Sequence, residues 1–124
     1  MPRIVVVEDN PDNRFLLQVL LEDTHELELF ESGPEALAAM AMRVPQLVLL
    51  DISLPGMDGP EILDRIRRDP RLTAVPVVAL TAHAMAGDRE KYLGMGFDAY
   101  MSKPITDEEQ LQALITRLLS RAAA

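Results

Sequence analysis

Short apolar runs rich in β-branched residues alternate with longer segments of helical character along the whole chain, and this alternation constrains the fold more than any other feature. The runs are residues 4–7, 27–30, 46–50, 76–80 and 99–102. Each has the length of a strand, and largely apolar strands are typical of a parallel sheet that helices cover on both faces. The sequence therefore predicts an α/β protein.

The intervening segments carry start signals of helices. Pro11 suits the first turn of one helix, and two pairs have the spacing of a capping box, Ser32 with Glu35 and Thr106 with Glu109. The expected helices cover residues 11–23, 60–68 and 84–93, with two more after the capping boxes, the last ending near residue 120. In the first helix, the apolar residues at helical spacing are Phe15, Leu16, Val19 and Leu20.

Five strand–helix units predict a doubly wound (βα)5 fold of the flavodoxin-like class, with right-handed crossovers. A parallel five-stranded sheet in the order 2-1-3-4-5 is one common solution for this class. In such a sheet, ligands bind beyond the carboxyl ends of the first and third strands.

Composition excludes several classes of function. The chain has 124 residues, which fits one domain, and a formal charge of -8 that gives no general attraction to nucleic acid or to an anionic membrane. It has no cysteine, which excludes a thiol nucleophile and a Cys-zinc site. Without a long apolar run or a signal peptide, a cytoplasmic protein is expected. His25 and His83 have no partner at metal-ligand spacing, and His25 is expected at the surface.

Polar side chains follow four of the five expected strands. Glu8 and Asp9 follow the first, Asp51 the third, Thr81 the fourth and Lys103 the fifth. Because the carboxyl ends of parallel strands lie at one edge of the sheet, these side chains are expected to converge.

Three carboxylates in one pocket repel each other, and a hard divalent cation is the simplest compensation. Mg2+ prefers oxygen ligands, so Asp9 and Asp51 are candidates for direct ligation and Glu8 for ligation through water, with a main-chain carbonyl just after Asp51. Asp51 is then a candidate nucleophile that forms an acyl phosphate. Lys103 and the Thr81 hydroxyl are suited to phosphate oxygens.

Each of these residues also has a structural interpretation when it is taken alone. Glu8, Asp9 and Asp51 are suited to helix or turn caps, Thr81 to the cap of the following helix, and Lys103 to the surface. Four strand ends that carry acid, acid, hydroxyl and amine are improbable as independent accidents, so the joint pattern favours a site.

The residues around these positions form segments that resemble the response-regulator receiver domain of two-component signalling, over essentially the whole chain. The segments are residues 5–10, 49–59, 78–84 and 100–104. Within the family, residues 8–11 and 81–88 look most like stand-alone regulators of the DivK type and the receivers of hybrid histidine kinases. The resemblance implies a single receiver domain over residues 1–124 without an output domain. It also implies a sensor histidine kinase or histidine phosphotransfer protein as phosphodonor, and a downstream protein target.

The resemblance also implies roles for individual residues. Asp51 would be the phosphorylated aspartate, and Glu8 and Asp9 the acidic metal pair. Ser53 would supply its main-chain oxygen to Mg2+, Thr81 and Lys103 would sense the phosphate, and Tyr100 would be the switch aromatic. The Lys103–Pro104 peptide bond would be cis. From their location alone, each two residues beyond a site residue, Ser53 and His83 are also predicted to tune the lifetime of the phosphate.

Three rival functions are weighed against this one. An aspartate-nucleophile phosphatase usually has a second aspartate two residues after the nucleophile, where this chain has Ser53. A nucleotide- or flavin-binding module needs a glycine-rich loop after the first strand, where Glu8 and Asp9 would repel phosphate. A pseudo-receiver would lack part of the acid, threonine and lysine set. One departure from relatives is the absence of a glycine in residues 22–26, which leaves the end of the first helix open.

Overall fold

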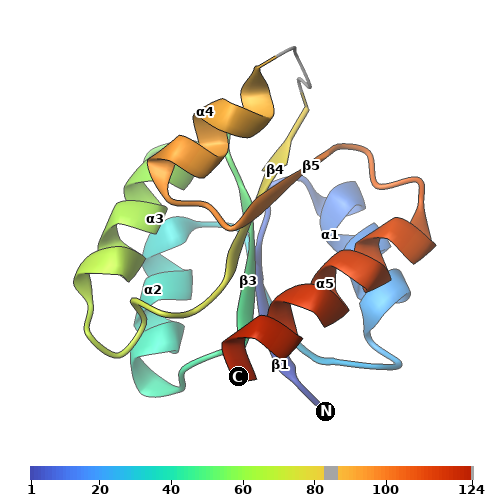
Figure 1. Ribbon diagram of the computed structural model, residues 1–124, viewed down its shortest axis with the longest axis horizontal. Coiled ribbons are helices and arrows are strands. Elements are labelled where there is room, and N and C mark those ends of the chain that lie inside the picture. Colours follow the sequence, from blue (N-terminus) through green and yellow to red (C-terminus); the bar gives the residue numbers. More distant parts are fainter. Residues whose placement is uncertain (83–86, 124) are drawn as a thin grey trace.

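Five parallel strands form one sheet in the order β2-β1-β3-β4-β5 in the computed structural model, which describes residues 1–82 and 87–123 (Figure 1). The strands are β1 (Arg3–Val7), β2 (Glu26–Phe30), β3 (Leu47–Asp51), β4 (Val77–Thr81) and β5 (Ala99–Ser102). The predicted sheet and its order are confirmed. The strands β3 and β4 each extend one residue further than predicted, so Asp51 and Thr81 are strand residues, opposite Leu80 and Ser102.

Helices cover both faces of the sheet, as Figure 1 shows. They are α1 (Pro11–Leu21), α2 (Gly33–Met42), α3 (Gly59–Arg68), α4 (Asp88–Met95) and α5 (Glu108–Ala123). Helices α1 and α5 pack with Ile4 and Val6 of β1 into one core, and α2, α3 and α4 pack with Val5 and Val7 into the other. The alternation along β1 follows from the period of two of a strand, which sends successive side chains to opposite faces. No helix in the described part of the chain is long and apolar enough to cross a membrane.

Two of the helix starts differ from the predicted caps. Asp107 caps α5, since its carboxylate accepts a hydrogen bond from Gln110 N at 3.0 Å, so the predicted cap at Thr106 is wrong by one residue. The Ser32 hydroxyl donates to the Glu35 carboxylate, but its side chain makes no bond to a backbone N–H, so the predicted capping box does not form there.

Helix α1 covers only part of the apolar residues named at helical spacing, with Leu16 and Leu20 half-buried against the core. Leu17 and Leu21 are buried, whereas Phe15 and Val19 are 65% and 51% exposed. Two apolar stripes run along this helix on opposite sides, and packing against the sheet decides which one is covered.

His25 is buried at 7% exposure, so the prediction of a surface histidine is wrong. Helix α1 ends at Leu21, whose carbonyl accepts from the N–H groups of Thr24 and His25. This turn needs no left-handed residue and therefore no glycine, and it brings the His25 ring back against the fold, beside the Thr24 hydroxyl at 2.8 Å.

Helix α4 begins at Asp88, after Gly87 in a left-handed conformation with φ of 90°. The first residues of the predicted helix, and His83 with them, lie outside the described residues.

Candidate functional site

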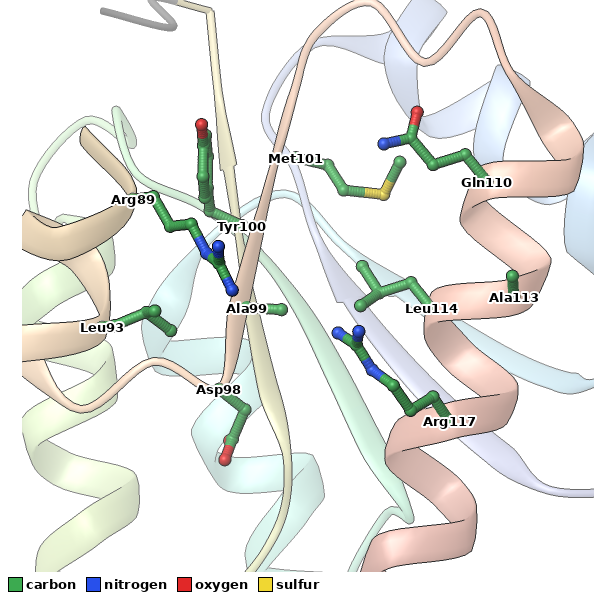
Figure 2. Close-up of a pocket in the computed structure, with 10 residues that line it drawn as sticks. All are labelled: Arg89, Leu93, Asp98, Ala99, Tyr100, Met101, Gln110, Ala113, Leu114 and Arg117. Carbon is green, nitrogen blue, oxygen red and sulfur yellow. The ribbon is translucent and has the colours of Figure 1, made fainter. Parts of the chain in front are cut away.

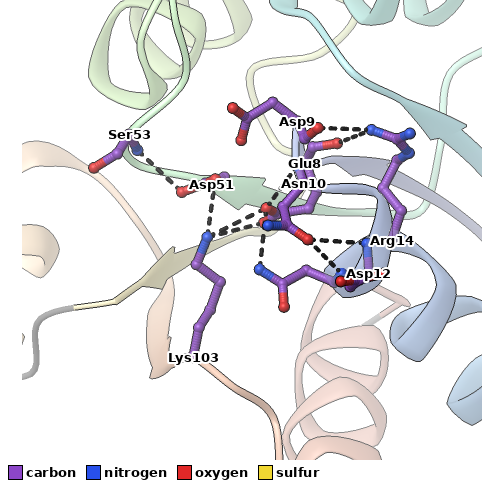
Figure 3. Close-up of polar contacts among 9 residues, drawn as sticks. Glu8, Asp9, Asn10, Asp12, Arg14, Asp51, Ser53 and Lys103 are labelled. Carbon is purple, nitrogen blue, oxygen red and sulfur yellow. Dashed lines mark hydrogen bonds and ion pairs between the residues drawn. The ribbon is translucent and has the colours of Figure 1, made fainter.

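The acidic and basic residues at the strand ends meet in one cluster (Figure 3). Lys103 Nζ lies 2.9 Å from Asp51 Oδ2 and 3.1 Å from Glu8 Oε2. The side chains are withdrawn from solvent, at 0% exposure for Glu8, 3% for Asp51 and 13% for Lys103. The sequence thus brings together three residues that are far apart along the chain.

The backbone around the cluster is held by bonds between neighbouring elements. Glu8 N donates to Phe30 O at the end of β2, and Lys103 N donates to Thr81 O at the end of β4. Ser53 N donates to Asp51 Oδ1 at 3.0 Å, which orients the carboxylate at the end of β3. The Lys103–Pro104 peptide bond is cis.

Burial and the neighbouring charges shift proton affinities in the cluster. Burial, and after it the charge of Asp51, raise the pKa of Glu8 above its ordinary value, although Lys103 opposes the rise. Burial lowers the pKa of Lys103, but the hydrogen bonds to Asp51 and Glu8 outweigh this effect and leave that pKa raised. Lys103 is therefore a permanent cation between two carboxylates at neutral pH.

The donor set fits a hard divalent cation. Glu8, Asp9 and Asp51 each offer a carboxylate oxygen, and these oxygens lie within 4.8 Å of one another. Three carboxylates against the one ammonium of Lys103 leave two negative charges uncompensated, which matches the charge of Mg2+. Oxygen ligands and partial exposure at Asp9 suit Mg2+, which keeps several waters.

The other predicted site residues differ in how close they lie to this cluster. Thr81 is buried at the end of β4, beside the backbone of Lys103. Ser53 is exposed next to Asp51, and Tyr100 is half-buried on β5, with its ring 6.0 Å from that of Tyr92. His83 is outside the described residues.

Sequence reasoning missed the residues of α1 that support the acidic pair. Asn10 caps α1 by accepting from the N–H groups of Asp12 and Asn13, and Asn13 Nδ2 lies 3.4 Å from Glu8 Oε1. Arg14 Nη1 donates to the carbonyl oxygens of Glu8 and Asp9 at 2.9 and 3.1 Å. Their position in the sequence could have indicated this role, because the first turn of a helix packs against the loop that precedes it.

The fold and the acidic cluster define a class of protein that comparison identifies. Residues 4–116 match the model of the response regulator receiver domain. The chain belongs to this family.

Individual relatives show the same relationship. The chain is 40% identical over 104 residues to the polar-differentiation response regulator DivK of Brucella ovis, covering 83% of this chain and 85% of that protein. It is 43% identical over 115 residues to the signal transduction histidine-protein kinase BarA of Escherichia coli, covering 92% of this chain but only 12% of the kinase. The chain therefore spans a small part of the kinases that it matches.

A solved structure of a receiver domain is similar to this chain over nearly its whole length. The receiver domain of the sensor histidine kinase PA1611 of Pseudomonas aeruginosa, with a magnesium ion coordinated in its active site cleft, superposes with a TM-score of 0.87 at 32% identity. The match covers 96% of this chain and 98% of that one. This chain is a receiver domain of the type that occurs in response regulators and histidine kinases.

Proposed function

We propose that Asp51 accepts a phosphoryl group from a phosphohistidine of a sensor histidine kinase or histidine phosphotransfer protein, in the presence of Mg2+. The observation that carries the proposal is the convergence of Glu8, Asp9 and Asp51 within 4.8 Å, with the ammonium of Lys103 bonded to two of them. The domain of PA1611, which holds magnesium in its cleft, supports the choice of metal.

The transfer is a substitution at phosphorus. A carboxylate oxygen of Asp51 forms an O–P bond while the P–N bond to the donor imidazole breaks, and the ring nitrogen keeps that electron pair. Glu8, Asp9, Asp51 and the main-chain oxygen of Ser53 would hold Mg2+, which would supply positive charge for the phosphoryl oxygens. Lys103 Nζ lies 2.9 Å from Asp51 and then pairs with a phosphoryl oxygen, which carries the negative charge after transfer.

The product stays on the chain, so the domain is an acceptor and not an enzyme with turnover, although it assists its own phosphorylation and dephosphorylation. Ser53 is exposed two residues beyond Asp51, where it can flank the approach of a hydrolytic water. We propose that it tunes the lifetime of the phosphate, together with His83. Equal lifetimes in Ser53→Asn and the parent would remove Ser53 from this role.

The phosphorylated state is read through a groove beside the switch residue. The Thr81 hydroxyl donates to the phosphoryl group, and Tyr100 changes its position in response. Tyr100 lines a groove between α4 and α5, and Arg89 and Arg117 extend toward it from the two helices (Figure 2). Although the chain carries a net charge of -8, the two arginines make this groove locally suited to a partner segment that combines apolar and acidic side chains.

The composition allows this switch to be observed directly. The chain has two tyrosines and no tryptophan, so Tyr92→Phe leaves Tyr100 as the single fluorophore. Phosphorylation is expected to change its fluorescence, and Thr81→Ala is expected to abolish that change while Asp51 is still labelled. An unchanged response in Thr81→Ala would contradict the proposed link.

The exposed stripe of α1 suits the phosphodonor. Pro11 and Asn13 line the pocket around Asp51, and Phe15 and Val19 continue the surface of α1 away from it. Phe15→Ser is expected to slow transfer from a phosphorylated kinase domain but not labelling by acetyl phosphate, which needs no docking surface. Equal slowing with both donors would place the effect in the site and not in docking.

The central experiment measures the mass of the chain after incubation with acetyl phosphate and Mg2+. One phosphate is expected on the parent and none on Asp51→Asn, and a chelator is expected to prevent labelling of the parent. Asp58→Asn is the matched control, because Asp58 caps α3 in the same loop and asparagine caps equally well. A parent that stays unlabelled, or an Asp51→Asn variant that labels like the parent, would refute the proposal.

A further inference from the structure

Arg14 forms hydrogen bonds to the backbone of Glu8 and Asp9, two of the three acidic residues of the site. Its Nη1 donates to the carbonyl oxygen of Glu8 at 2.9 Å and to that of Asp9 at 3.1 Å. In Figure 3 the guanidinium approaches this segment from the side opposite Lys103. The same nitrogen lies 3.9 Å from Glu31, just after β2, and the Arg14 side chain is 24% exposed.

These two bonds fix the backbone on both sides of one residue. The carbonyl of Glu8 belongs to the peptide plane before the Cα of Asp9, and the carbonyl of Asp9 belongs to the plane after it. Because each peptide group is planar, holding both carbonyls restricts φ and ψ of Asp9 and hence the direction of its Cβ. The bonds therefore fix the direction of the Asp9 Cβ and, with it, the region that the carboxylate can reach.

Asp9 depends on this support more than its neighbours do. Lys103 holds the carboxylates of Glu8 and Asp51. Within residues 1–82 and 87–123, by contrast, no side chain or backbone group bonds the carboxylate of Asp9. The position of its Cβ is set by the backbone, and Arg14 holds that backbone.

We infer that Arg14 is a positioning residue for the Mg2+ site, which aims Asp9 at the cation without touching it. This inference rests on the proposed function, since it assigns a role toward the metal of that site. Groups that orient metal ligands typically change metal affinity by about 10- to 100-fold when they are removed.

The charge of Arg14 and its hydrogen bonds have opposite expected effects on the affinity for Mg2+. A guanidinium close to the site repels a divalent cation, so a purely electrostatic role predicts tighter Mg2+ binding when the charge is removed. A positioning role predicts weaker binding, because Asp9 loses its fixed direction. The sign of the change in Kd for Mg2+ therefore separates the two roles.

The test is calorimetric titration of the whole chain with Mg2+, without any phosphodonor. Arg14→Met keeps most of the stem and removes charge and donors, and its Kd is expected to rise about tenfold. Arg14→Lys keeps the charge but can serve one carbonyl at a time, so a rise of about threefold is expected. Arg68→Met, which removes an exposed arginine paired with Asp64 on α3, is the matched control and should bind like the parent.

A second measurement separates positioning from general damage. The rate of labelling by acetyl phosphate in Arg14→Met should need more Mg2+ for half-saturation, yet reach the parent's rate at saturation, because Asp51 and Lys103 are unchanged. A lower saturating rate with an unchanged Kd would overturn the inference. Thermal unfolding without Mg2+ checks that the variants are folded at the temperature of the titration.

The outcomes are distinct. A parent that binds no Mg2+ would overturn the proposed metal site and this inference with it. A parent that binds Mg2+ while Arg14→Met binds equally well or more tightly would overturn the role of Arg14 alone. If Arg14→Met does not fold, Arg14→Lys decides, and a Kd equal to that of the parent rejects the inference.

Discussion

Gly59, the first residue of α3, lies against the backbone of Asp51 and Ile52. A Cβ added at Gly59 would lie 2.7 Å from the carbonyl oxygen of Asp51 and 2.8 Å from the Cα of Ile52. Neither atom can move away as a flexible side chain would. Ile52 N is bonded to Leu80 O at 2.9 Å, and Gly59 N to Ile52 O at 3.1 Å. We therefore expect Gly59→Ala to displace the start of α3 or the end of β3.

The size of the effect follows from the atoms that the new methyl group meets. Overpacking of a well-packed region typically costs about 1–3 kcal/mol, and because backbone atoms are struck here we expect about 2 kcal/mol or more. Two other glycines provide a series. At Gly33 a Cβ would meet the Ile62 side chain at 2.7 Å, which can adjust, so a smaller loss is expected. At Gly94, inside α4, nothing lies within 4 Å, so Gly94→Ala should stabilise by about 0.5–1 kcal/mol.

Urea unfolding of the parent and the three variants, followed by circular dichroism, gives the free energies of unfolding, and labelling with acetyl phosphate gives the rates. The expected order of stability is Gly94→Ala, parent, Gly33→Ala and Gly59→Ala, and labelling should slow in Gly59→Ala because the Asp51 carboxylate moves with its backbone. A Gly59→Ala variant as stable as the parent and labelled equally fast would refute the reasoning from backbone contact.

Three further predictions concern charged groups. Lys103→Met should bind Mg2+ more tightly, because the carboxylates lose a competing cation. It should also be phosphorylated more slowly by acetyl phosphate, because the phosphoryl group loses its cationic partner. Calorimetry measures the first effect and mass spectrometry the second, and an unchanged Kd for Mg2+ would contradict the first. Burial lowers the pKa of His25, so the unfolded chain takes up that proton first as pH falls below about 6.5, and the contribution of His25 to the free energy of unfolding should fall from pH 7.5 to pH 5. This part of the pH dependence should disappear in His25→Gln. Arg67 donates to the carbonyls of Val75 and Gly96 and pairs with Asp98, so Arg67→Met should lower the free energy of unfolding by about 2 kcal/mol without changing the Kd for Mg2+.

The sheet and its strand order could be predicted from the sequence because apolar runs and helix signals alternate along the whole chain. The limits of β3 and β4 were less accessible, since a polar residue at the end of an apolar run gives no sign of whether it still pairs. Asp51 does pair, opposite Leu80, and Thr81 lies opposite Ser102. Side-chain polarity alone therefore placed both strand ends one residue early.

Packing between distant elements could not be predicted. Helix α1 has apolar residues on two sides, and the sequence does not say that Leu17 and not Phe15 is covered. A histidine in a charged turn suggests the surface, but the turn after Leu21 returns the His25 side chain to the fold. In both cases the position of the element relative to the sheet decides burial, and helical periodicity carries no information on that position.

The site could be predicted from the sequence only in part. The convergence of Glu8, Asp51 and Lys103 follows from the parallel sheet alone. The particular bond between Lys103 and Glu8 could not be predicted in this way, because it joins residues 95 positions apart in the sequence. The part played by Arg14 depends on backbone carbonyls, which every residue has, so no residue pattern marks it. The chemical roles of these residues in phosphorylation remain predictions that the experiments above test.

The cluster makes most sense as a site that is unfavourable for the fold until a cation arrives. Glu8 is fully buried beside a second carboxylate, and burial together with Asp51 raises its pKa, so its ionised form destabilises the folded chain. Folding alone would favour apolar residues at these strand ends. Lys103 offsets part of the repulsion but leaves excess negative charge, and a cation that binds this folded arrangement and not the unfolded chain must stabilise it, by RT ln(1 + [Mg2+]/Kd). The rise in unfolding free energy with Mg2+, and its reduction in Asp51→Asn, therefore measures how much of the repulsion the metal relieves.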